Sequence, residues 1–263
     1  MKNYVSAYFI IIFLLTINIA SGKSNNLKKF LPDYSNNKIS KEDSSSSKIP
    51  EGMTANKVIE NYIKALGGKD NLRKVEDRTT AMTSNINGHK ITMTIYQKAP
   101  DKMRQIVDLG SFKQNIYFDG SQGMMEVEDK KLEVKGNELE KLKFESTLDL
   151  LINLDSLGIK LKLDGIYTVN EKETYKIEMI LPSGTKWIQY YDSQSGLKVE
   201  ESKDITAPQG TYTQITFLGD YREVNGIKYP FSIKQEVGQQ KIKFEVSTIQ
   251  VNTGLADKLF EIK

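Results

Sequence analysis

The sequence predicts an α+β fold, a strongly curved antiparallel β half-barrel of about 11 strands with helices packed in or over its open side. From residue 75 onward the chain is a series of strand-length segments, each ended by a tight-turn signal. One helical segment precedes this series, and helical material interrupts it after about five strands. These helices need an apolar surface to cover, which an open curved sheet offers and a closed barrel does not.

The first helix is expected to begin after Thr54, a favourable N-cap residue. Gly67 and Gly68 are expected to end it, since glycine readily adopts the left-handed conformation of a helix C-terminus. A short helical turn over residues 69–74 follows. The apolar stripe of the helix is Val58, Ile59, Tyr62 and Leu66.

Turn signals place the strands. Residues 79–86 and 90–98 are expected to form a hairpin across Asn87 and Gly88, a strong type I′ signal. Further strands are expected at residues 103–109, 112–118 and 124–128, and six or seven more at residues 159–251.

Residues 132–144 are rich in Leu, Glu and Lys, which predicts a surface helix. Residues 146–149 resemble a capping box, which predicts a second helix over residues 150–157, ended by Gly158. These helices could close the mouth of the half-barrel. A displaceable plug would let the cavity open for a ligand, whereas a permanent plug would be ordinary core.

Residues 1–22 are predicted to be a secretory signal peptide, with Lys2, an apolar stretch and small residues at the cleavage point. A transmembrane anchor is the alternative, but the apolar run of about 13 residues is shorter than the roughly 20 that span a bilayer. Residues 23–52 are expected to be a polar disordered tether, and residues 53–263 the folded domain. The expected location is the periplasm, with peripheral membrane contact.

The residues that most enzymes and metal sites require are nearly absent. His89 is the single histidine and the chain has no cysteine, so a common zinc site is not expected. Asp119, Asp192 and Asp220 follow strands, where turn chemistry explains them. The net charge is only +3, from 37 basic and 34 acidic residues, which argues against a nucleic-acid partner. We therefore expect no catalytic residues, no metal and no cofactor.

The methionines suggest an adaptable apolar surface instead. Five of the eight fall in the first five expected strands, and such flexible side chains suit irregular ligands, although they also fit an ordinary core. Together with the expected plug, these strands give the candidate ligand-binding residues Met82, Ile91, Met93, Ile95, Met103, Ile116, Phe118, Leu148, Leu151 and Ile152.

Several motifs occur in a specific order. They are YIKALGGK at residues 62–69, IYQKAPDKMR at 95–104, IYFDG at 116–120, YYDSQSGL at 190–197 and DYREVNGIKYPF at 220–231. This order resembles the periplasmic lipoprotein carrier family, its outer-membrane receptor relatives and other exported lipoprotein-sorting-like proteins, over about residues 54–263.

The resemblance implies a half-barrel whose helical lid covers a hydrophobic cavity for acyl chains. In the carrier, an Arg directly before the Pro helps to latch the lid; this chain has Ala99 there, with Lys98 beside it. We expect an exported, non-catalytic protein that holds acyl chains of a lipid or lipoprotein, with an envelope protein as a further partner. The alternative is an envelope sensor or protein-interaction module whose own helices fill the cavity.

Overall fold

The computed structural model describes residues 43–44, 48–86, 88–110, 112–128, 130–207 and 210–262. The expected signal peptide, residues 1–22, lies outside the described residues, as does most of the expected tether. No helix in the described ranges is long and apolar enough to cross a membrane.

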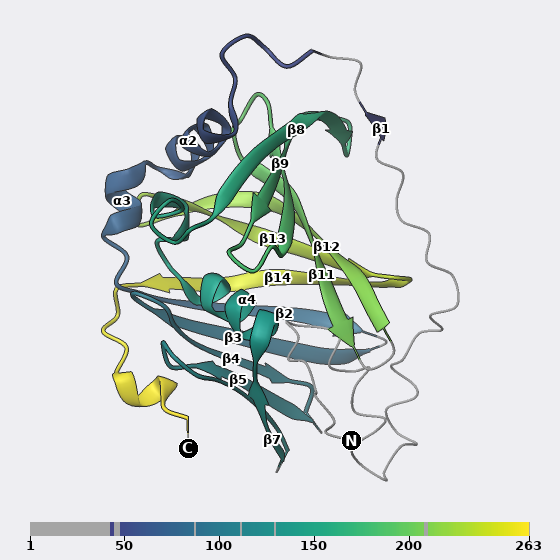
Figure 1. Cartoon of the computed structure of the whole chain (residues 1–263). Helices are drawn as coiled ribbons and strands as arrows, with labels where there is room; N and C mark the ends of the chain where they lie inside the picture. The colour runs from purple at the N-terminus through teal and green to yellow at the C-terminus, as the bar shows by residue number, and fades with distance from the viewer. Residues whose placement is uncertain are drawn as a thin grey trace.

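The strands of the described residues form one antiparallel sheet in the order β1-β8-β9-β10-β11-β12-β13-β14-β2-β3-β4-β5-β6-β7. The sheet is strongly curved and does not close on itself (Figure 1). Its strands are β1 (Asp43–Ser44), β2 (Asp77–Ile86), β3 (His89–Lys98), β4 (Lys102–Asp108), β5 (Lys113–Phe118), β6 (Gly123–Val127), β7 (Lys130–Val134), β8 (Lys160–Val169), β9 (Lys172–Ile180), β10 (Lys186–Asp192), β11 (Lys198–Ala207), β12 (Gly210–Val224), β13 (Ile227–Val237) and β14 (Gln240–Val251).

The first long strand and the last strand meet in the middle of the sheet. Strand β14 pairs with β2, with Val246 opposite Met82, and consecutive hairpins extend the sheet on either side of this junction. The junction joins residues more than 150 positions apart, so turn signals alone could not predict it. The curved open sheet confirms the half-barrel in outline.

The number of strands is higher than predicted, with 13 in the sheet besides the two-residue β1. One reason is that residues 130–134 form β7, where Leu132 pairs with Met125 of β6. The prediction of a helix beginning at residue 132 is therefore wrong at its start. The edge of β6 offers unpaired backbone groups, and pairing with them overrides the helix propensity of Leu, Glu and Lys.

The helices of the described residues are α2 (Ala55–Leu66), α3 (Lys69–Arg73), α4 (Gly136–Ser146) and the 3₁₀ turns η2 (Leu150–Ile152) and η3 (Asp257–Phe260). The predicted cap of α2 is confirmed, because the Thr54 hydroxyl accepts a hydrogen bond from the Lys57 amide at 3.2 Å. Helix α2 buries its predicted stripe, and Gly67 follows it with a φ of 124°.

The predicted second helix over residues 150–157 is wrong, because only the three residues of η2 are helical there. Ser146 does not cap a new helix: it is the last residue of α4, and its hydroxyl donates to the Leu142 carbonyl at 2.8 Å. The Asn153 side chain bonds Asp149, and the Ser156 hydroxyl bonds the Asn153 carbonyl. Such local side-chain hydrogen bonds compete with a regular helix.

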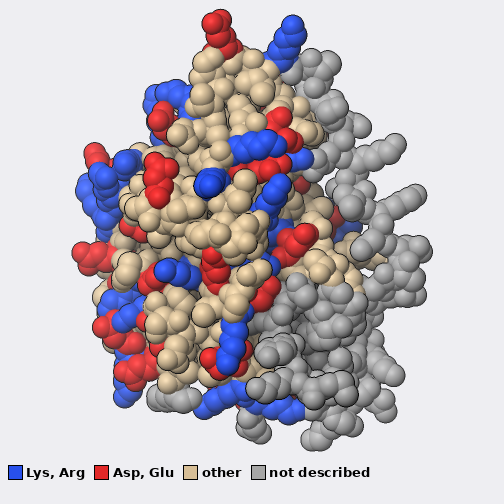
Figure 2. All heavy atoms as spheres, in the orientation of Figure 1, with Lys and Arg blue, Asp and Glu red and all other residues tan. Residues whose placement is uncertain are grey.

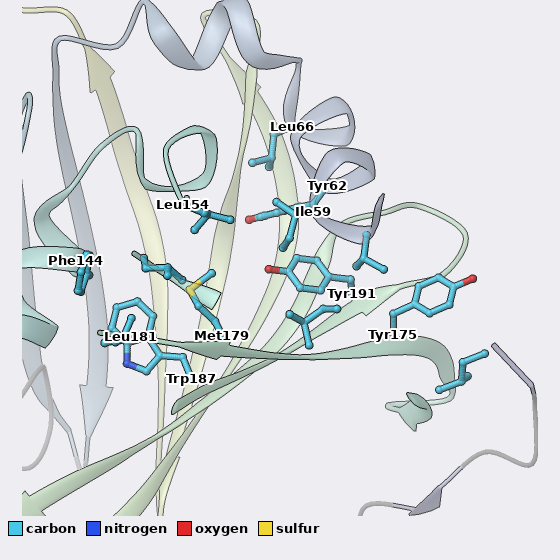
Figure 3. Close-up of a cluster of buried hydrophobic side chains, with 14 residues drawn as sticks. Ile59, Tyr62, Leu66, Phe144, Leu154, Tyr175, Met179, Leu181, Trp187 and Tyr191 are labelled. Carbon is cyan, nitrogen blue, oxygen red and sulfur yellow. The ribbon is translucent and has the colours of Figure 1, made fainter. Parts of the chain in front are cut away.

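The buried apolar residues of the described chain form three clusters. The first joins α2 to strands β8–β10, where the rings of Tyr62 and Tyr191 lie 5.0 Å apart (Figure 3). The second lies among β2, β3, β13 and β14, and the third joins β4–β6 to Leu142 of α4. Helix α2 thus packs on one half of the sheet, whereas α4 contributes Phe144 to the first cluster and Leu142 to the third and so contacts both halves.

Candidate functional site

A cavity of about 380 Å³ lies between the sheet and residues 136–152, which contain α4 and η2 and which we call the cover segment. This volume falls within the roughly 300–1,000 Å³ typical of small-molecule sites. Figure 1 shows α4 lying against the curved sheet. The cavity wall is built from strands far apart in the sequence, from β2–β4 and from β9–β14.

One wall is apolar. Met82, Ile95 and Met103 come from three adjacent strands, β2, β3 and β4, and their side chains line the cavity. Leu148 and Leu151 of the cover segment line the same cavity. Five of the ten candidate ligand-binding residues therefore meet at one cavity.

The other five candidates lie elsewhere. Ile91 and Met93 are buried in the core cluster of β2, β3, β13 and β14, and Ile116 and Phe118 are buried in the cluster beneath α4. Ile152 lines a separate pocket of about 370 Å³ beside α2. Strand alternation identifies the inward face, but other side chains decide which part of that face is left to line a cavity.

The opposite wall, from β10–β13, carries two rows of mainly polar side chains beside the apolar Leu218 and Ile233, and sequence reasoning missed it. One row across strands β10–β13 is Gln189, Glu201, Thr216 and Gln235, each opposite the next in register. A second row is Trp187, Lys203 and Gln214. All seven line the cavity. In the sequence, these polar residues look like the solvent-exposed face of each strand. Only their regular alternation along each strand indicated that they share one face of the sheet.

The charged groups of this wall occur in pairs. Lys203 pairs with Glu145 of the cover segment, and Lys198 pairs with Glu201 at 2.5 Å. Burial alone would lower the pKa of Lys203, but Glu145 and Glu201 raise it above the usual value. Burial raises the pKa of the Glu145 carboxyl above the usual value, and Lys203 offsets this only in part. Burial alone would raise the pKa of Glu201, yet Lys198 and Lys203 hold it below the usual value.

Hydrogen bonds fasten the cover segment to both halves of the sheet. The Gln97 side-chain amide of β3 donates to the Glu145 carbonyl at 3.0 Å, and the Leu148 amide donates to the Pro100 carbonyl at 3.4 Å. On the other side, the Lys141 ammonium donates to the Asp204 carbonyl of β11 at 2.8 Å. The cover segment therefore bridges the open side of the curved sheet.

Ala99, which stands where the carrier has its latch arginine, does not fasten the cover segment. The Ala99 amide donates to the Glu76 carbonyl at 2.8 Å. The Lys98 ammonium donates to the Leu255 carbonyl at 2.8 Å and pairs with Asp257 at 3.0 Å. Lys98 thus holds the C-terminal segment, while Gln97 and Lys203 hold α4.

Turn chemistry explains Asp119 and Asp192, but the expectation for Asp220 is wrong, because Asp220 lies within β12 and pairs with Arg222. Asp119 accepts hydrogen bonds from the amides of Ser121 and Gln122, and Asp192 accepts them from Gln194 and Ser195. His89 is exposed at the start of β3. Within the described ranges, no group of three His, Cys, Asp or Glu residues could hold a metal ion.

Basic and acidic side chains are interspersed over the face of the molecule seen in Figure 2. Phosphate backbones require a concentrated basic surface, and this face does not present one.

A curved, open antiparallel sheet with a partly covered cavity defines the class of the fold. No family model and no curated protein sequence matches the chain. Solved structures share the fold, including the following three. A DUF1329 family protein from Desulfovibrio piger is 13% identical, with 79% of this chain and 97% of that chain covered and a TM-score of 0.52.

A LolA superfamily protein from Nitrosomonas europaea is 12% identical, with 80% of this chain and 99% of that chain covered and a TM-score of 0.52. An outer membrane lipoprotein-sorting protein domain from Vibrio parahaemolyticus is 10% identical, with 79% and 97% covered and a TM-score of 0.51. At these identities the comparisons show the fold alone. The resemblance to lipoprotein-sorting proteins noted in the motifs is confirmed at that level.

Proposed function

We propose that this protein is an exported, non-catalytic binding protein that holds an acyl chain of a lipid or lipoprotein in the covered cavity. The apolar side chains of Met82, Ile95 and Met103, which line the cavity together with Leu148 and Leu151, carry the proposal. Each buried CH₂ contributes about 0.8 kcal/mol, so about eight of them contribute about 6 kcal/mol before the cost of association. An acyl chain of ordinary length can thus supply useful affinity.

The shared fold supports the proposal without deciding it, because one fold hosts unrelated functions. Export follows from the expected signal peptide of residues 1–22, and residues 53–263 would form the mature carrier domain after a polar tether. N-terminal sequencing of the protein from its own envelope should begin near Lys23. Recovery of Met1 on membrane-bound protein would contradict export with cleavage.

Trp187 makes cavity binding directly measurable. It is the single tryptophan of the chain, it is 6% exposed, and it lines the cavity. A fatty acid brominated at mid-chain should quench its fluorescence with a saturable dependence on concentration, while the same unbrominated acid should not quench it.

Two neighbouring residues provide a matched pair of variants. Leu150 lines the cavity, whereas Ile152 lines the separate pocket beside α2. Leu150→Phe should weaken quenching by roughly tenfold, because it fills space that the chain needs, and Ile152→Phe should leave it unchanged. Absence of quenching in the unaltered protein, or equal effects of both variants, would contradict binding in this cavity.

The alternative is an envelope sensor or interaction module with a permanent cover. The ion pair of Lys203 with Glu145 and the bond from Lys141 to Asp204 favour it, since they hold the cover segment in place. Amide exchange in residues 136–152 should be faster than in β9 and β10, and should change on adding fatty acid, if the cover opens. Exchange as slow as in those strands, and insensitive to lipid, would favour the module and a protein partner.

A further inference from the structure

Buried polar atoms without a hydrogen-bond partner among the described residues gather at this cavity. They are both side-chain amide atoms of Gln105, the Oε1 atoms of Gln214 and Gln235, and Nε1 of Trp187. The four residues are 1%, 2%, 3% and 6% exposed, respectively, and all line the cavity. Buried polar groups are nearly always paired, so several unpaired ones around a single cavity indicate a partner that enters it.

The unpaired atoms come from both halves of the sheet. Gln105 lies on β4, between Ile95 of β3 and Ile116 of β5 in register. Gln214 and Gln235 lie on β12 and β13, within the polar rows. A group placed between these strands is therefore flanked by amides on two sides, next to the apolar wall.

The character of the unpaired atoms restricts the chemistry of the ligand. The lysines of this wall are already paired with carboxylates, Lys203 with Glu145 and Lys198 with Glu201. The third cation of the lining, Arg78, already donates to Gln97 Oε1 and lies over the Tyr229 ring. The unpaired atoms belong to uncharged amides and an indole, and three of the five are carbonyl oxygens, which only accept hydrogen bonds. A carboxylate or a phosphate diester cannot donate to them. A hydroxyl or an amide group can both donate and accept.

We propose that the amide-lined wall is a headgroup subsite for an uncharged hydroxyl or amide group of an amphiphile. The chain of that amphiphile would lie against Met82, Ile95 and Met103. The inference rests on the proposed function, because it assigns a headgroup to the same acyl-binding cavity. It makes the cavity selective for the headgroup rather than for apolar chains in general.

Three pyrene-labelled probes with the same chain test the subsite. They end in a glycerol ester, a free carboxylate and a methyl ester, and energy transfer from Trp187 reports their binding. The glycerol ester should bind at least about tenfold more tightly than the other two, because a site built for hydrogen bonds discriminates against analogues that lack them.

The double variant Gln214→Leu/Gln235→Leu should bind the three probes with similar affinity. Its melting temperature should not fall much, since each leucine replaces an amide with an unpaired oxygen. Gln240→Leu is the matched control. Gln240 also has an unpaired buried Oε1, but it lies at the start of β14 and outside the cavity lining, so headgroup preference should persist. If the double variant does not fold, the single Gln235→Met variant replaces it.

The outcomes separate the subsite from the proposed function. Equal affinities in the unaltered protein, tighter binding of the carboxylate probe, or a preference that survives in the double variant would each overturn the subsite and leave acyl binding intact. Failure of all three probes to bind would overturn the proposed function together with the subsite.

Discussion

Lys203 of β11 and Glu145 of α4 form an ion pair that joins the cover segment to the polar wall of the cavity. Their side chains are only 10% and 15% exposed, so solvent screens the pair weakly. The Lys203 ammonium also lies 5.6 Å from the ring centre of Trp187. This pair, rather than a residue before Pro100, connects the cover to the far side of the sheet.

Removing the lysine should release the cover segment. Lys203→Met leaves the Glu145 carboxylate buried without its cation, which costs roughly 3 kcal/mol. Amide exchange in α4 should therefore accelerate by roughly 100-fold relative to β9. Lys243→Met is the control, because the Lys243–Glu245 pair is mostly exposed and contributes little. Equal exchange rates in the two variants would show that the pair does not hold the cover.

Acid should favour closure of the cover segment although it discharges the Lys203–Glu145 pair, because burial disfavours the charged form of Glu145 by more than Lys203 favours it. Burial raises the pKa of both Glu145 and Glu138 above the usual 4.5, in spite of Lys203 and Lys141. Opening the cover would return these pKa values toward 4.5, so protons bind the closed form preferentially. Closure is strongest below the ordinary pKa and weakens as the pH rises through the raised values.

Amide exchange in α4, corrected for its intrinsic pH dependence, should thus be slower at pH 5 than at pH 7. The double variant Glu138→Gln/Glu145→Gln should lose most of this difference. Faster corrected exchange at pH 5 would show that acid opens the cover segment instead of favouring its closure.

Helix α4 packs against the sheet at Gly123 of β6. A Cβ atom at this position would lie 2.8 Å from Leu142 Cδ2 and 2.9 Å from Val134 Cβ. Gly123→Ala should lower the free energy of unfolding by about 1–3 kcal/mol through overpacking, as measured by urea denaturation. Gly219→Ala in β12 is the control, since no heavy atom lies within 4 Å of its added methyl group. An unchanged free energy of unfolding in Gly123→Ala would mean that α4 can move away from the added methyl group at little energetic cost.

Asp77 fixes the C-terminal segment to the start of β2. Its buried carboxylate accepts hydrogen bonds from the amides of Thr253, Gly254 and Leu255, at 2.8, 2.8 and 3.1 Å. Burial alone would raise the pKa of Asp77, but these amides hold it below 3.8. Its stabilisation is therefore present above pH 3.8 and is lost as the pH falls through the lower, folded-state pKa.

Asp77→Asn should lower the free energy of unfolding at pH 7 by roughly 2–3 kcal/mol, because hydrogen bonds to a charged group are lost. The loss should shrink when urea denaturation is repeated near pH 3. Asp220→Asn, which removes an exposed pair with Arg222, should have little effect at either pH. A pH-independent loss would mean that shape, and not charge, matters at Asp77.

Local features of the sequence determined much of the fold. Thr54 and Gly67 delimit α2 because capping depends on a few neighbouring residues. Asn225 and Gly226 adopt positive φ angles of 52° and 76°, as the hairpin between β12 and β13 requires. Alternation correctly placed Met82, Ile95 and Met103 on the inward face, because side chains of a strand alternate between two faces.

Only the tertiary structure decided which inward residues line the cavity. Met93 and Ile95 share a strand face, yet Met93 is buried in the core and Ile95 borders the cavity. Gln189 and Gln235 join one polar row only because β10–β13 pair in a particular register. Strand pairing and burial depend on partners that are distant in the chain, whereas caps, turns and alternation depend on neighbours. The sequence by itself therefore determined the inward face, and tertiary packing determined which part of that face lines the cavity.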